Sequence, residues 1–241
     1  MLEHLKREVC KANLDLVRHG LVIMTWGNVS AIDRPSGKVV IKPSGVSYSV
    51  MKPTQMVVVS LLTGETVEGR LAPSSDLATH LELYRAFAGI GGIVHTHSLY
   101  ATAWAQARRE IPVTGTIHAD YFHGPIPCTR SLTAGETLKH YESNTGRVVV
   151  ERFRKLDPMA IPAVLVANHA PFAWGAMVDL AVENAVVLEY VARLANETLR
   201  ANPTARAMPR SLLDKHFLRK HGPGAYYGQS CSQQNLKSRR E

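Results

Sequence analysis

Three of the eleven histidines in this 241-residue chain stand where they could bind one metal ion. His95 and His97 form a His-x-His pair after the apolar run 91–94, which is typical of a buried strand. Residues i and i+2 of a strand point to the same face, so both imidazoles would emerge together. His169 follows a second apolar run, 164–166. Two strand ends that bring three imidazoles into one cleft would leave coordination positions open, which is the arrangement of catalytic zinc.

A plainer interpretation is that these histidines hydrogen-bond the backbone at strand ends. In a chain with this many histidines, chance alone gives about 0.5 His-x-His pairs. From the residues alone, both interpretations of His95 and His97 stay open, and for His169 taken by itself the backbone interpretation is the simpler one.

Three short segments have the composition of a phosphate site. Each combines small side chains with a turn or a helix start, and unpaired N–H groups at such places attract anions. The best placed of them precedes a helix that Leu77, Leu81 and Tyr84 predict by their spacing. Each pair is also common in plain turns and helix caps. The segments are Gly27-Asn28, Ser44-Gly45 and Ser74-Ser75.

Two further places carry titratable groups. Asp120, within segment 116–121, lies between expected loops and could act as an acid or base, although a lone aspartate is more often solvated or capping. Segment 215–228 contains His216 and Tyr227 together with Lys215, Arg219, Lys220 and His221. Its default interpretation is a polar helix face at the surface.

The elements that must position these residues follow from periodicity. Apolar residues spaced three and four apart predict an amphipathic first helix that ends at Gly20. An extended stretch over 21–32, a turn over 33–37 and a strand over 38–42 predict a hairpin. Strands and helices alternate irregularly, which favours a mixed or antiparallel sheet covered by helices. We expect further strands at 56–60, 91–96, 148–151 and 163–167, and helices from 76, at 99–107 and at 178–199.

Composition limits the class of protein. Hydrophobic residues make up 45% of the chain and charged residues 20%, which is ordinary for a globular protein. The net charge of +8 is spread out, with no basic stripe interleaved with aromatic residues, so nucleic-acid binding has little support. No apolar run is long enough to span a membrane. Three scattered cysteines and a charged, helical start favour a reducing, cytoplasmic location.

Together these segments resemble the class II aldolase/epimerase (aldolase II/adducin) family, and among its members the pentulose-phosphate 4-epimerases. The resemblance runs in order through residues 1–229, which we expect to form one domain, whereas 230–241 is expected to be a disordered tail. The matching segments are 25–30 (TWGNVS), 41–46 (IKPSGV), 73–76 (PSSD), 91–98 (GGIVHTHS), 118–121 (HADY), 169–175 (HAPFAWG) and 213–229.

The resemblance implies a three-layer α/β/α sandwich around a mostly antiparallel sheet, assembled as a homotetramer with active sites at the subunit interfaces. It assigns His95, His97 and His169 as zinc ligands, with Asp76 as a further carboxylate at the metal. Asp120 and Tyr227 would be the acid/base pair, the tyrosine coming from a neighbouring subunit. Contacts to the phosphorylated substrate are assigned to Gly27, Asn28, Ser44, Gly45, Ser74 and Ser75, with His216 close by.

The implied reaction is the epimerisation of L-ribulose 5-phosphate to D-xylulose 5-phosphate, by cleaving and re-forming the C3–C4 bond, in the breakdown of arabinose or ascorbate. One alternative is a sugar-phosphate aldolase of the same family, in which a glutamate typically stands where this chain has Asp76. A second is a non-catalytic adducin-like domain, against which the retained histidines argue. A third, a cupin-like metal protein, is disfavoured by the helix content.

Two residues depart from the family pattern. Ala170 stands where a glycine usually follows the third metal histidine, and an alanine would strain the turn if that position needed a positive φ. Ile117 stands where a threonine is usual, which removes a polar group beside the site. Both departures bear on activity rather than on the fold.

Overall fold

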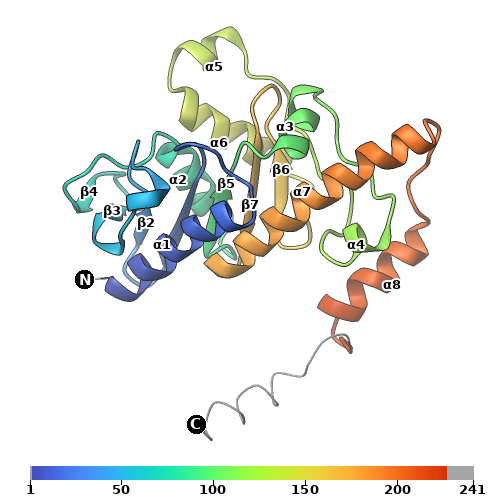
Figure 1. Cartoon of the computed structure of the whole chain (residues 1–241), viewed down its shortest axis with the longest axis horizontal. Coiled ribbons are helices and arrows are strands. Elements are labelled where there is room, and N and C mark those ends of the chain that lie inside the picture. Colours follow the sequence, from blue (N-terminus) through green and yellow to red (C-terminus); the bar gives the residue numbers. More distant parts are fainter. Residues whose placement is uncertain (1, 227–241) are drawn as a thin grey trace, which may run out of the picture.

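The computed structural model describes residues 2–226, and within this range seven strands form one antiparallel sheet (Figure 1). The order across the sheet is β4-β3-β2-β1-β5-β7-β6, so the two strands nearest the histidines, β5 and β7, are neighbours, and β7 lies beside the edge strand β6. The strands are β1 Asn28–Asp33, β2 Lys38–Ile41, β3 Val57–Ser60, β4 Thr66–Glu68, β5 Gly92–His95, β6 Ala163–Leu165 and β7 Pro171–Gly175.

Helices cover both faces of this sheet, and the alternation of side chains along β7 shows which helices lie on which face. Trp174 points to one face, where its ring packs against Phe87 and Phe153 at the ends of α2 and α6. Gly175 points to the other, where an added Cβ would lie 2.7 Å from Leu180 of α7. The helices are α1 Glu3–Arg18, α2 Leu77–Ala86, α3 Leu99–Gln106, α4 Thr116–Ala119, α5 Ala134–Leu138, α6 Tyr141–Arg152, α7 Val178–Ala201 and α8 Arg210–His221, with short 3-10 turns η1 Tyr48–Val50 and η2 Pro53–Gln55.

This arrangement is the expected three-layer sandwich. Helices α1 and α7 pack against the sheet and each other on one face, α2 and α6 pack together on the other, and α4 and α8 form an extension beyond the end of the sheet (Figure 1). The predicted first helix, the β1–β2 hairpin, β3, β5, β6, α2, α3 and α7 are all present within one or two residues of their expected ends, except that β1 begins only at Asn28.

One predicted strand is wrong. Residues 148–151 lie in α6, although three consecutive valines favour a strand. The helix is selected by its packing: Gly146 lies so close to α2 that an added Cβ would be 2.6 Å from the Cβ of Glu82. Val148 and Val149 are buried, so tertiary contacts outweigh the local preference.

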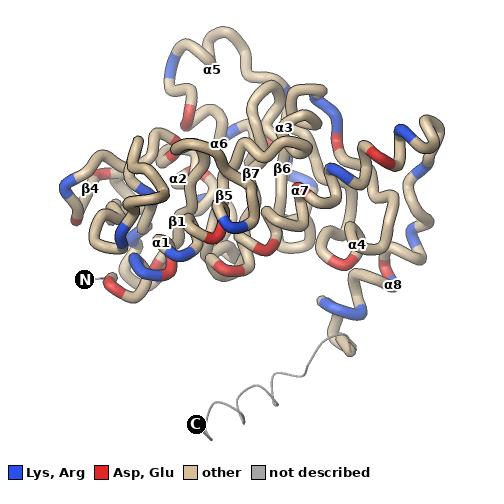
Figure 2. The backbone as a smooth tube through the Cα atoms, in the orientation of Figure 1, with Lys and Arg blue, Asp and Glu red and all other residues tan. Residues whose placement is uncertain are grey.

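Charged residues are interspersed along the surface helices, as Figure 2 shows for α1 and α8. Lys11 and Arg18 both pair with Asp15 on α1, and Arg210 pairs with Asp214 on α8. Among the described helices, none has the length and apolar character needed to cross a membrane. The expected domain boundary at 229 and the tail 230–241 lie outside the described residues.

Candidate metal centre and substrate pocket

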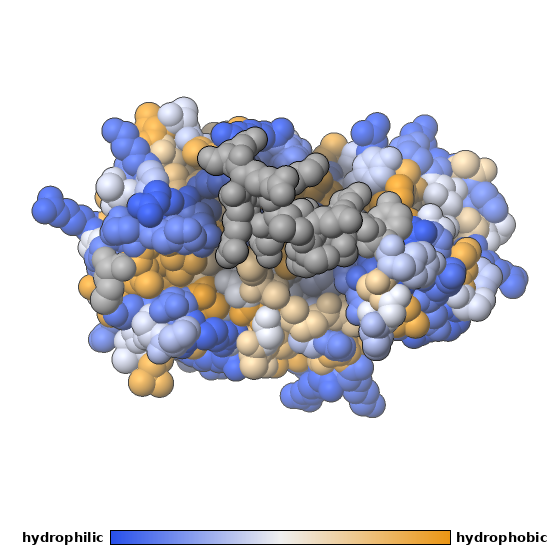
Figure 3. Space-filling model, turned by 90° about the horizontal axis from the view of Figure 1, so that it is seen from below, coloured by the Kyte–Doolittle hydropathy of each residue, from blue (hydrophilic) through white to orange (hydrophobic). Residues whose placement is uncertain are grey.

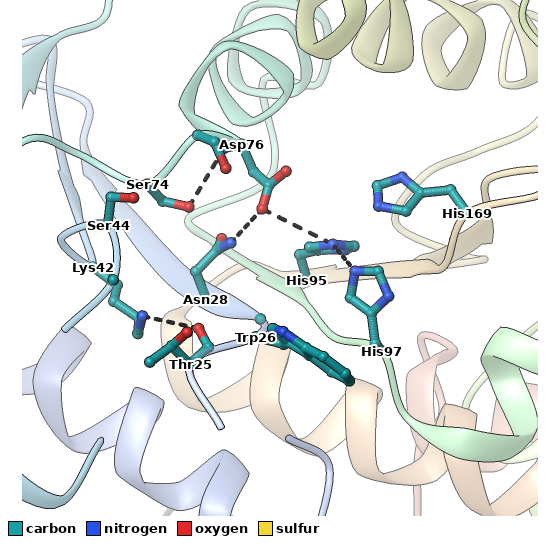
Figure 4. Close-up of a pocket in the computed structure, with 13 residues that line it drawn as sticks. Thr25, Trp26, Asn28, Lys42, Ser44, Ser74, Asp76, His95, His97 and His169 are labelled. Carbon is teal, nitrogen blue, oxygen red and sulfur yellow. Dashed lines mark hydrogen bonds and ion pairs between the residues drawn. The ribbon is translucent and has the colours of Figure 1, made fainter. Parts of the chain in front are cut away.

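The three predicted histidines converge. Each of His95, His97 and His169 offers one ring nitrogen, and these nitrogens all lie within 4.8 Å of one another. The Nε2 atoms of His95 and His97 are 3.1 Å apart. Two nitrogens bound to one tetrahedral zinc ion at the usual bond length would be separated by about 3.4 Å. The three imidazoles therefore have the spacing of ligands that share one ion (Figure 4).

The pairing of strands explains this convergence. His95 ends β5 and lies opposite Phe172 of the antiparallel strand β7. Because neighbouring antiparallel strands run in opposite directions, the start of β7 lies beside the end of β5. His169 stands two residues before β7, in the turn that follows β6, and is thereby brought next to His95. Both histidine positions were predicted at strand ends, but β7 was not predicted as a strand.

The hydrogen bonding of the histidines suits metal binding. The Nδ1 of His95 lies 3.0 Å from the carbonyl oxygen of Pro171, and donation to that oxygen leaves Nε2 with a free lone pair facing the other rings. The Nδ1 of His169 is buried and has no hydrogen-bond partner in the described part of the chain. Burial lowers the pKa of His95 and of His97, and that of His169 to about 4, so all three imidazoles are neutral at pH 7, as metal ligands must be. This donor set could bind a divalent metal ion.

Asp76 lies beside this cluster. Its Oδ2 accepts a hydrogen bond of 2.6 Å from the side-chain amide of Asn28 and lies 3.9 Å from the Nε2 of His95. Burial by itself would raise the pKa of Asp76, but the neighbouring histidines and the bond from Asn28 outweigh it and lower the pKa. The carboxylate is therefore ionised where it could serve as a further ligand or balance the charge of a metal.

All the predicted phosphate contacts except His216 line the same cavity as the histidines. The cavity encloses about 540 Å³, and Gly27 and Gly45 border it with φ of +79° and +67°. At Gly27 an added Cβ would lie 2.8 Å from Val22 and 2.9 Å from the carbonyl oxygen of His95. Only glycine fits there. The predicted residues in the lining are Gly27, Asn28, Ser44, Gly45, Ser74, Ser75, Asp76, His95, His97 and His169.

Thr25, Trp26 and Lys42 also line this cavity and were not predicted. Lys42 is only 2% exposed, and burial lowers the pKa of its ammonium group against the opposing charge of Asp76. Its Nζ contacts the carbonyl oxygens of Thr25 and Pro43, and among residues 2–226 it forms no ion pair. The one sequence signal was a lysine immediately before the Pro43-Ser44-Gly45 turn.

Asp120 and His216 are brought together, but they do not line the cavity. The Nδ1 of His216 lies 3.0 Å from Asp120 Oδ1, and the guanidinium group of Arg219 donates to both carboxylate oxygens at 2.9–3.0 Å. Burial would raise the pKa of Asp120, but these partners lower it. Asp120 directly follows α4 and His216 belongs to α8, and both helices lie beyond the end of the sheet (Figure 1). Tyr227 lies outside the described residues.

The two departures from the family pattern are now placed. Ala170 is buried and is not among the residues with positive φ, and the left-handed position of the turn falls on Asn168, with φ of 61°. The expected strain at Ala170 is therefore absent. Ile117 lies on α4, outside the lining of the cavity, and is 43% exposed.

The seven-stranded antiparallel sheet, with the histidine cluster where β5 ends and β7 begins, agrees with the fold of solved aldolases. The family model described as "Class II Aldolase and Adducin N-terminal domain" matches residues 7–196, and the chain belongs to this family. The chain is 55% identical over 228 residues to "L-ribulose-5-phosphate 4-epimerase UlaF" of Salmonella paratyphi B, covering 95% of this chain and 100% of that protein.

Solved structures agree with the fold. An L-fuculose 1-phosphate aldolase superposes with a TM-score of 0.75 at 27% identity, covering 88% of this chain and 94% of the other. A sugar-phosphate aldolase from Thermotoga maritima has a TM-score of 0.65 at 20% identity, covering 86% and 98%. At 20% identity, the Thermotoga maritima structure supports a similarity of fold only.

Proposed function

We propose that this protein is a zinc-dependent L-ribulose-5-phosphate 4-epimerase. The observation that carries the proposal is the cavity itself, in which three neutral imidazoles and an ionised carboxylate lie beside a wall of small polar groups and a buried lysine. The identity of 55% to a relative named for this activity selects the reaction within the family. Asp76, where aldolases of the family typically have glutamate, favours the epimerase over the aldolase.

The proposed chemistry follows from the bond that must change. C4 bears a hydroxyl group but no acidic proton, so its configuration cannot invert by simple deprotonation. Cleavage of the C3–C4 bond releases glycolaldehyde phosphate from the enediolate of dihydroxyacetone, and the aldehyde can turn over before the bond re-forms on its other face. A divalent metal bound to His95, His97 and His169 would supply Lewis-acid stabilisation of the negative charge that develops.

The chain's own residues supply the rest. Ser44, Gly45, Ser74 and Ser75 would hold the phosphate of the aldehyde fragment, and Lys42 would balance its charge, so that the fragment stays in place while it rotates. Removal and return of the proton on the C4 oxygen from opposite sides requires two acid/base groups. We assign these to Asp120 and Tyr227, with His216 close to the substrate.

This assignment requires a second copy of the chain. Asp120 and His216 do not line the cavity of their own chain, so in the proposed homotetramer a neighbouring subunit would bring its acid/base groups to each cavity. Large apolar side chains near the cavity are exposed, among them Met24 at 74% and Trp26 at 49%, as is Leu99 at 73%. Hydrophobic groups also lie between the charged ones on the face shown in Figure 3. We propose that such surfaces are buried on assembly, and that the enzyme acts in the cytoplasm.

The test is turnover. Purified protein loaded with zinc should convert L-ribulose 5-phosphate to D-xylulose 5-phosphate, and removal of the metal by a chelator should abolish this activity. A loaded protein that instead accumulates free glycolaldehyde phosphate and dihydroxyacetone would be an aldolase. Absence of any product despite bound zinc would contradict the proposed function.

A further inference from the structure

Tyr48 lies behind the cavity and touches two of its walls without lining it. It belongs to the 3-10 turn η1, is 7% exposed, and its hydroxyl lies 2.9 Å from the carbonyl oxygens of both Trp26 and Gly27. Burial raises the pKa of this hydroxyl, so the group stays protonated and donates. One proton is shared between two successive carbonyl oxygens.

The peptide groups that Tyr48 holds belong to the wall of the cavity. In a trans peptide the N–H points opposite to the carbonyl, so the bond to the Trp26 carbonyl turns the Gly27 N–H away from Tyr48. Gly27 and Asn28 line the cavity, and the side-chain amide of Asn28 donates a hydrogen bond to Asp76. The left-handed φ at Gly27 and its close approach to the His95 carbonyl leave this segment little freedom to shift.

The ring of Tyr48 faces the second wall. The Nζ of Lys42 lies 5.0 Å from its centroid, within the range of a cation–π contact. The same Nζ is 3.3 Å from the carbonyl oxygen of Thr25, so Lys42 and Tyr48 together bind the carbonyls of three successive residues, 25–27. Because this buried ammonium group forms no ion pair with a carboxylate of residues 2–226, it can pair with an anion that enters the cavity.

We propose that Tyr48 is a positioning residue for anion binding. Its hydroxyl fixes the Trp26-Gly27 segment of the cavity wall, and its ring fixes the ammonium group of Lys42. Both are thereby placed where they can bind the phosphate of the substrate. The inference deepens the proposed function and rests on it for the identity of the substrate. The role is one of geometry, since Tyr48 itself does not border the cavity.

The test compares metal-loaded Tyr48→Phe with Tyr190→Phe, a matched control at a half-exposed tyrosine on α7. Tyr48→Phe keeps the ring and loses only the hydroxyl. We expect its KM for L-ribulose 5-phosphate to rise about tenfold, the worth of one hydrogen bond of about 1.4 kcal/mol, while kcat changes little. Calorimetric titration with inorganic phosphate should show the same tenfold loss of affinity, and zinc content should be unchanged. The control, Tyr190→Phe, should match the wild type in its kinetic constants, its phosphate affinity and its zinc content.

Two results would overturn the inference. One is unchanged phosphate affinity and KM in Tyr48→Phe, even if the melting temperature falls, since the hydroxyl would then be structural only. The other is a wild-type protein that binds no phosphate. If the wild type binds phosphate but turns over no pentulose phosphate, the proposed function fails, and the phosphate titration of the two variants still decides the role of Tyr48.

Discussion

Replacement of His97 by alanine tests the metal centre with the least damage to the fold. His95 is 1% exposed and packed on Phe172, so its loss would leave a cavity in the core, whereas His97 is exposed at the mouth of the site. His97→Ala therefore removes one proposed metal ligand and little buried surface. The matched control is His4→Ala, at a histidine whose side chain is 79% exposed on α1.

The size of the effect follows from the number of ligands. Protein sites with four ligands bind zinc with a free energy of about 10–16 kcal/mol, which is roughly 3 kcal/mol for each ligand. Loss of one imidazole should therefore weaken zinc binding at least about 100-fold. At a zinc concentration that saturates the wild type, a 100-fold loss removes about 2.7 kcal/mol of metal-dependent stabilisation. In a chain of this size that corresponds to about 5–10 °C in melting temperature.

The assay is thermal unfolding with and without zinc, together with the zinc content after dialysis against a metal buffer. We expect the wild type and His4→Ala to bind one zinc ion per chain and to melt higher with zinc. His97→Ala should lose the ion and this increase, yet melt like the metal-free wild type. Full occupancy in His97→Ala at the wild-type affinity would refute the assignment of His97 as a ligand.

Three further outcomes are expected. Tyr227→Phe should keep its zinc and lose most of its turnover, and a near-normal rate would remove Tyr227 from the mechanism. Gly27→Ala should lower the free energy of unfolding more than Gly37→Ala does. Both glycines have a positive φ, which costs about 1–3 kcal/mol for a residue with a side chain, but of these two only Gly27 has neighbours within 4 Å of an added Cβ. Equal losses of stability in urea unfolding would show that this close approach is unimportant. The ion pair with Arg219 lowers the pKa of Asp120 in the folded protein. The pair therefore stabilises the fold fully above the pKa of aspartate in the unfolded chain, about 3.9. This stabilisation is lost as the pH falls through the lower pKa that Asp120 has in the folded protein. The stability difference between wild type and Arg219→Met should therefore shrink below about pH 4, and a difference independent of pH would contradict the pairing.

The elements with strong local patterns were predictable from the sequence. The amphipathic α1, the long α7 and the β1–β2 hairpin have the periodicities of their structures. The strand predicted at 148–151 failed because packing of α6 on α2 outweighs the preference of its valines. β7 was missed because it begins with proline and mixes aromatic with small residues, and its place between β5 and β6 is set by tertiary pairing.

Some residues of the candidate site could be predicted from local sequence patterns, and others only from the fold. The three histidines and the small polar residues that line the cavity are recognisable from the sequence because they lie in short segments. Lys42 was missed because a lysine in a strand is ordinarily solvated, and only the fold shows it buried at the cavity. The pairing of Asp120 with Arg219 joins residues 99 positions apart, a separation at which no local pattern operates.

The most direct measurement is anomalous X-ray scattering at the zinc absorption edge from crystals of the metal-loaded protein. We expect one peak per chain, about 2.0–2.1 Å from a ring nitrogen of each of His95, His97 and His169. A peak elsewhere, or three imidazoles that hydrogen-bond to the backbone and leave the ion uncoordinated, would contradict the account.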